Sequence, residues 1–130
     1  VKYQAANQDT YENVKVNVEG KLRKKLFSGE AKFNGKIIVD GITLDYSNYP
    51  LTFTKKGSGV LDFIKDGSFN TYGSIIISNS FDNMTIMIDK NGEWSSEDGW
   101  LISAPCSNIK EAAAISNLLF KRSNPEINIK

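Results

Sequence analysis

Residues 73–94, GSIIISNSFDNMTIMIDKNGEW, constrain the fold more than any other stretch, because they hold the densest run of strand-forming apolar residues. Ile75, Ile76 and Ile77 form an unbroken β-branched run, which is typical of a strand covered on both faces. The next run, MTIMID, has the period of two that a strand requires. Polar residues separate the runs, and Asn91-Gly92 suits a type I′ turn. The stretch predicts two strands that fold back on each other, followed by the start of a third.

The same alternation of short apolar runs and turn residues recurs through the earlier part of the chain. Val14, Val16 and Val18 alternate with polar residues, as in a strand with one buried face. Asp40-Gly41 and Asp66-Gly67 lie between strand-like runs and predict hairpin turns. These signals predict a meander of β-hairpins.

The periodicity becomes helical only after Pro105. Asn108 is suited to cap a helix, and Glu111 stands at the position that completes a capping box. Asn124-Pro125 is a stop signal. Apolar residues gather on one side of the intervening segment: Ile109, Ala112, Ala113, Leu119 and Phe120. We therefore expect one amphipathic helix near residues 108–122.

These elements predict a mainly β fold, a small antiparallel barrel or sandwich of about eight strands with one C-terminal α-helix. A length of 130 residues suits one domain with its own core. The opening residues, through Glu12, are mostly polar. We expect residues 1–12 to be a polar N-terminal tether and residues 13–130 to form a single β-rich domain.

The charge balance gives no reason to expect nucleic-acid binding. Sixteen Lys and Arg residues face fifteen Asp and Glu residues, for a net charge of +1. The chain has only two arginines, Arg23 and Arg122, for guanidinium recognition of phosphate. The basic cluster Lys21, Arg23, Lys24 and Lys25 is interpreted as a solvated strand end protected from edge pairing, with an anion-binding patch as the alternative. We expect a protein partner or a small ligand.

The sequence contains no histidine, and this absence is its most informative functional feature. It removes the commonest general base, the usual zinc ligand and every Ser-His or Cys-His nucleophile pair. We therefore expect no cofactor, no metal and no enzymatic activity.

Two residues before the predicted helix are the remaining candidates for chemistry. Cys106 is the single cysteine, placed where the helix dipole lowers a thiol pKa. Ser107 and Lys110 spell S-x-x-K, a serine nucleophile motif. Without a base, we interpret Cys106 as a structural thiol and Ser107 as a capping residue. A weak hydrolase or thiol enzyme using either residue is an alternative.

The cellular location is predicted from the start of the chain. The sequence begins at Val1 without an initiator Met, and it contains neither a spanning apolar run nor a signal-peptide core. We expect a processed or trimmed chain from a bacterial envelope or secreted protein, with a membrane tether upstream of Val1 as one possibility. A cytoplasmic location is the alternative.

The leading functional hypothesis is a non-catalytic binding or assembly module. The main alternative is a lipocalin-like barrel that binds a small apolar ligand; a cavity lined by Phe and Ile would favour it, and a filled core would favour the surface module. Tryptophans near an acidic loop are candidate anchors for a partner, although the preferred interpretation is that they cap the hydrophobic core. The candidate binding surface is Trp94, Glu97, Asp98, Trp100, Tyr46 and Tyr49.

Overall fold

The computed structural model describes residues 1–5, 7–24, 29–78, 82–89, 94 and 99–123. Within them the chain forms ten strands and one helix, which confirms the predicted mainly β fold with a C-terminal helix. The helix is α1, Ile109–Ser123. The strands are β1 Lys2–Gln4, β2 Asn7–Glu12, β3 Val16–Lys24, β4 Ala31–Val39, β5 Ile42–Asp45, β6 Leu51–Phe53, β7 Ser58–Lys65, β8 Ser68–Ile77, β9 Met84–Ile88 and β10 Trp100–Ala104.

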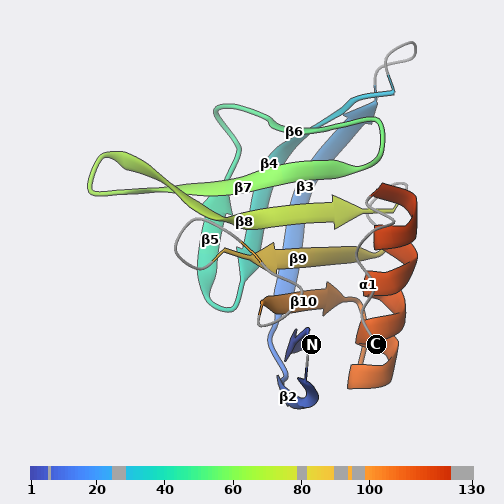
Figure 1. Cartoon of the computed structure of the whole chain (residues 1–130). Helices are drawn as coiled ribbons and strands as arrows, with labels where there is room; N and C mark the ends of the chain where they lie inside the picture. Colours follow the sequence, from blue (N-terminus) through green and yellow to red (C-terminus); the bar gives the residue numbers. More distant parts are fainter. Residues whose placement is uncertain (6, 25–28, 79–81, 90–93, 95–98, 124–130) are drawn as a thin grey trace.

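The strands form two antiparallel sheets. The six-stranded sheet has the order β2-β1-β10-β9-β8-β7. The four-stranded sheet has the order β3-β4-β5, with β6 also paired to β4. Figure 1 shows β3 and β4 crossing β8, β9 and β10 at a steep angle, as in an orthogonal sandwich. No closed barrel is found among the described residues, so the sandwich is the form that the structure supports.

The fold has three layers, because the six-stranded sheet also carries α1. One apolar cluster, which we call the inter-sheet cluster, fills the space between the two sheets and includes Phe33, Phe53 and Ile86. A second, the sheet–helix cluster, includes Leu101 and Phe120. Strands β8, β9 and β10 all contact α1 (Figure 1). The central strands of the six-stranded sheet are therefore covered on both faces.

The isoleucine run on β8 shows this double coverage directly. Ile75 and Ile77 belong to the inter-sheet cluster, whereas Ile76 belongs to the sheet–helix cluster. All three side chains are buried. The prediction of a strand covered on both faces is confirmed.

The predicted tether over residues 1–12 is corrected by the structure, which places strands β1 and β2 in this segment. β1 pairs with β10, with Tyr3 opposite Leu101. Val1, Tyr3 and Ala5 are buried at alternating positions against the sheet–helix cluster. The polar residues between them obscure this short alternating pattern in the sequence. Strands β1 and β2 bring the described strands to ten, compared with the predicted number of about eight.

A network of buried hydroxyl groups ties α1 to the sheet beneath it. Tyr3 donates to Ser116 on α1, with 2.6 Å between the oxygens. The Oγ atoms of Ser103 and Ser116 lie 2.7 Å apart, and Thr85 Oγ1 lies 2.9 Å from Ser103 Oγ. Burial raises the pKa of Tyr3 to about 12 because the phenolate would lose its hydration. Each hydroxyl has a partner, so the network fixes the position of α1 at no desolvation penalty from unmatched groups.

The predicted turns are tested where the structure describes them. Asp40 and Gly41 have φ values of 50° and 80°, and Asp66 and Gly67 have 54° and 78°. Positive φ at both central residues is what a type I′ hairpin turn requires. Both predicted turns are confirmed, whereas Asn91-Gly92 lies outside the described residues.

Candidate binding surface

Exposed apolar side chains gather on the hairpin formed by β7 and β8. Val60 is 58% exposed, Ile64 60% and Phe69 66%. Ile64 and Phe69 are directly opposite each other across the two strands. Figure 1 shows the tip of this hairpin projecting from the edge of the six-stranded sheet. We define the hairpin surface as Tyr49, Val60, Ile64 and Phe69.

The sequence of β7 explains why its apolar residues face two ways. Leu61 is fully buried in the inter-sheet cluster, and Phe63 is partly buried against it. Because side chains alternate along a strand, Val60 and Ile64 point to the opposite face. β7 is the last strand of its sheet, and α1 contacts β8, β9 and β10. The outward apolar residues of β7 therefore remain exposed.

Tyr49 connects the hairpin surface to the core through a series of rings. Its ring makes edge-to-face contacts with Phe69 at 5.9 Å and with Tyr46 at 5.8 Å between centroids. Burial raises the pKa of Tyr49, and the negative charges of Asp62 and Asp45 raise it further. Tyr49 is half-buried and is thus held in a fixed position at the surface.

Tyr46 is a core residue that holds the edge strand. Its hydroxyl accepts from the backbone N–H of Asp62 at 3.0 Å and donates to the carbonyl of the same residue at 3.2 Å. The side chain is 1% exposed, and burial raises its pKa strongly. Tyr46 therefore supports the surface on which Tyr49 lies.

An open groove of about 410 Å³ runs beside β7. Tyr49, Val60 and Asp62 line it together with Pro50 and Thr52 from the neighbouring loop and β6. The groove connects two members of the hairpin surface and gives it a concave part. A concave surface of this kind can receive side chains of a partner protein.

The two tryptophans lie in another part of the molecule. Trp94 Nε1 donates to the Trp100 carbonyl at 3.0 Å, and its ring lies 6.1 Å from that of Phe120 in the sheet–helix cluster. Lys2 Nζ lies 5.6 Å from the centroid of the Trp100 ring. Both tryptophans are half-buried. Trp94 is thus held by the Phe120 ring and by the backbone carbonyl of Trp100.

The structure brings together only parts of the predicted candidate surface. Trp94 contacts Trp100, and Tyr46 contacts Tyr49. Trp94 packs against the sheet–helix cluster, whereas Tyr46 belongs to the inter-sheet cluster. Glu97 and Asp98 lie outside the described residues.

The residues considered for chemistry have other partners. Cys106 donates its thiol hydrogen to the Ser103 carbonyl at 3.1 Å. Asn108 Oδ1 accepts from the Glu111 N–H at 2.9 Å, as predicted for the helix cap. The carboxylate of Glu111 accepts from the Ser107 N–H at 3.1 Å. These contacts give both Cys106 and Ser107 a structural explanation at the start of α1.

The basic cluster is divided between two places. Arg23 donates to Asn34 Oδ1 at 2.7 Å, from β3 to β4. Lys24 lines a separate pocket at the end of the same strand. Lys25 lies outside the described residues. Arg23 and Lys24 are adjacent on β3, but the first bonds to β4 and the second lines a pocket.

Sequence reasoning did not identify Val60, Ile64 and Phe69 as surface residues. The available signal was the run VLDFI, which places apolar residues on both faces of a strand. Such a run is typical of a strand buried on both faces. Its position at a sheet edge became visible only in the assembled fold.

The chain was compared with protein-family models, curated proteins and solved structures, and none of these comparisons gave a match.

Proposed function

We propose that this chain is a non-catalytic binding and assembly module that docks another protein through the hairpin surface. One observation carries the proposal: Val60, Ile64 and Phe69 are 58%, 60% and 66% exposed and share one projecting hairpin. Single exposed apolar residues are common on proteins, whereas a group of them is typical of an interaction site. Burying one such side chain releases about 1.5–3 kcal/mol, so covering the group favours docking.

The form of docking follows from the edge strand. An open strand edge can add a strand of a partner through its free N–H and C=O groups. At Asp62, however, both groups already bond to the Tyr46 hydroxyl. The partner is therefore expected to pack apolar side chains against Val60, Ile64 and Phe69, with Tyr49 as an aromatic anchor.

The filled space between the sheets supports a surface module over the lipocalin-like alternative. Phe33, Ile37 and Phe53 occupy this space and are each at most 1% exposed. The alternative of a weak enzyme has less support from the contacts. The Cys106 thiol bonds to a backbone carbonyl, and the neighbouring serine takes part in the helix cap.

The proposal is tested by crosslinking from two positions of matched exposure. A photoreactive phenylalanine derivative replaces Phe69 in one protein and Leu118 in the other. Leu118 is 64% exposed but lies on α1, away from the hairpin tip (Figure 1). The full chain is returned to its source cells, illuminated and analysed by mass spectrometry.

We expect position 69 to give a discrete crosslinked protein and position 118 to give none. Adding Ile64→Ser to the position 69 protein should remove the product, because it deletes the apolar neighbour without touching the core. Equal crosslinking at both positions, or none at either, would contradict the proposal.

The proposed compartment is the bacterial envelope or the exterior of the cell, as the sequence predicts. Among the described residues, no helix has both the length and the apolar character needed to cross a bilayer. Fractionation of the source cells tests the location, and recovery of the whole protein in the cytoplasm would refute it.

A further inference from the structure

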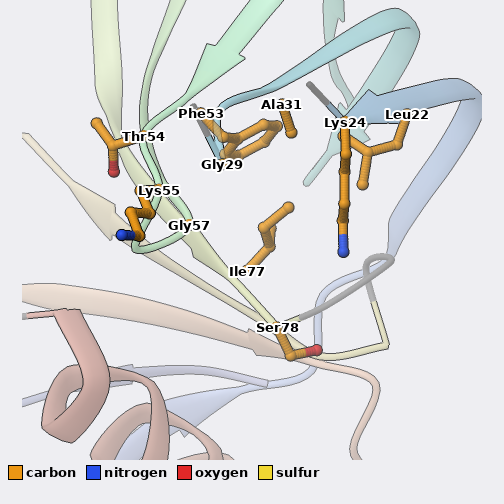
Figure 2. A pocket seen from close by; sticks show the side chains of 10 residues that line it. All are labelled: Leu22, Lys24, Gly29, Ala31, Phe53, Thr54, Lys55, Gly57, Ile77 and Ser78. Atoms are coloured by element: carbon orange, nitrogen blue, oxygen red, sulfur yellow. The ribbon is translucent and has the colours of Figure 1, made fainter. Parts of the chain in front are cut away.

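A second concave site lies at one open end of the sandwich. It occupies the space between the end of β3, the start of β4 and the end of β8 (Figure 2). Its volume is about 180 Å³. We call it the sheet-mouth pocket. It contains none of the four residues of the hairpin surface, and the described lining of the groove beside β7 shares only Thr54 with it.

The interior of the pocket is apolar. Leu22, Ala31, Phe53 and Ile77 line it, and the last three are buried members of the inter-sheet cluster. The pocket therefore exposes the rim of the core at the mouth between the two sheets. An aliphatic group placed there would replace water against existing core side chains.

The charge at the pocket is positive. Lys24 and Lys55 line it, and the described lining residues include no carboxylate. Figure 2 shows Lys24 reaching from β3 in the direction of Ser78, whereas the ammonium of Lys55 points away from the middle of the pocket. Lys24 is thus the cation best placed to meet an anion whose apolar part enters the pocket.

The hydroxyl groups of the lining are already engaged. Ser78 Oγ accepts from the Asn83 N–H at 2.8 Å, and Thr54 Oγ1 accepts from the Ser58 N–H at 3.3 Å. The stem of Lys55 packs close to Gly29, whose φ of 72° favours glycine. These contacts fix the walls, so recognition rests on the apolar interior and on Lys24.

We infer that the sheet-mouth pocket binds a short aliphatic carboxylate, with its tail against Ile77 and Phe53 and its carboxylate at Lys24. The volume of about 180 Å³ is close to that of an engineered apolar cavity of about 150 Å³ that binds benzene. A ligand of roughly six to nine non-hydrogen atoms is therefore suitable, below the size of a typical drug-like ligand. A site this small and open should have a dissociation constant on the order of 1 mM.

The test is a titration followed by nuclear magnetic resonance, using hexanoate as the probe. Hexan-1-ol removes the charge, hexylamine reverses it, and acetate removes the tail. We expect hexanoate alone to give saturable shifts at Leu22, Ala31 and Ile77. Lys24→Met retains the apolar stem without the charge and should weaken hexanoate binding about tenfold.

Lys36→Met is the matched control, because Lys36 is an exposed lysine on the same sheet and does not line the pocket. It should leave hexanoate binding unchanged. The inference is overturned if hexanoate gives no saturable shifts at the pocket, if the alcohol or the amine binds as tightly, or if both lysine substitutions weaken binding equally. Both substituted lysines are exposed, so each variant should fold and give a readable result.

Discussion

The two halves of β8 have opposite surroundings although both consist of strand-forming residues. At one end, residues 75–77 are buried, with α1 on one face and the four-stranded sheet on the other. At the other end, Phe69 is 66% exposed on the projecting hairpin. The same kind of residue thus forms core where two layers meet on it and a docking surface where the layers end. Neighbouring elements, more than residue type, decide which role an apolar side chain takes.

A bulge marks the boundary between these halves. The β7–β8 register shifts between Leu61 and Asp62, which are opposite Gly73 and Thr71. A Cβ at Gly73 would collide with the backbone carbonyl of Met87 on β9, so the strand needs glycine there. Bulges bend a strand and increase its twist. The bulge therefore turns the hairpin out of the layered region.

The largest predicted effect comes from shortening a side chain in the covered half. Ile76→Ala should lower the free energy of unfolding by about 2–5 kcal/mol, because it leaves a cavity under α1. Ile64→Ala, on the projecting hairpin, should change it by less than about 0.5 kcal/mol. Chemical denaturation of both variants measures the difference. Similar losses at the two positions would break the distinction between the halves.

The next effect concerns pH and the hydroxyl network of the covered region. The pKa of Tyr3 rises from 10.0 to about 12 on folding. Between these values the unfolded chain has lost a proton that the folded chain keeps, so stability falls as pH rises. This contribution is complete below pH 10 and is lost through about pH 12, with a size of about 3 kcal/mol.

Tyr3→Phe isolates this contribution, because the other titrating groups remain in both proteins. The variant should lose its own hydrogen bond to Ser116 at neutral pH but show a flatter decline of stability above pH 10. Denaturation at several pH values compares the two slopes. Parallel declines would show that Tyr3 titrates in the fold as it does in the unfolded chain.

The smallest effect lies at the boundary between the halves. Tyr46→Phe removes the hydroxyl that binds both backbone groups of Asp62, at a cost of about 1–2 kcal/mol. The Asp62 amide should then exchange its hydrogen faster, because β7 has lost its outer partner. Tyr49→Phe is the control, since the ring contacts of Tyr49 with Tyr46 and Phe69 are retained. Unchanged exchange at Asp62 would mean that β8 alone holds the edge strand.

Local signals in the sequence predicted the local structure well. The Ile75–Ile77 run predicted a strand with two covered faces, and the Asp40-Gly41 and Asp66-Gly67 pairs predicted hairpin turns. Asn108 and Glu111 predicted the start of α1. Each of these features depends on residues that are close in the chain, so the residue pattern contains the required information.

The remaining features depend on neighbours that are distant in the chain. Tyr3 is buried because β1 lies beside β10, and nothing in the polar sequence around it predicts that pairing. Val60 and Ile64 are exposed because β7 ends its sheet. Tyr46 and Trp94 separate because they pack in different clusters. The sequence therefore identified Tyr49, one residue of the hairpin surface, as a candidate. The position of that surface depends on the strand order, which the sequence did not predict.

The pairing of β1 with β10 also affects how the protein is made. Val1 and Ser103 exchange backbone hydrogen bonds although they are 102 residues apart in the chain. During synthesis, β1 leaves the ribosome long before its partner exists, and closing so long a loop slows folding. The sheet can therefore be completed only after β10 has emerged, so its first strand must wait for nearly the whole described chain to be translated.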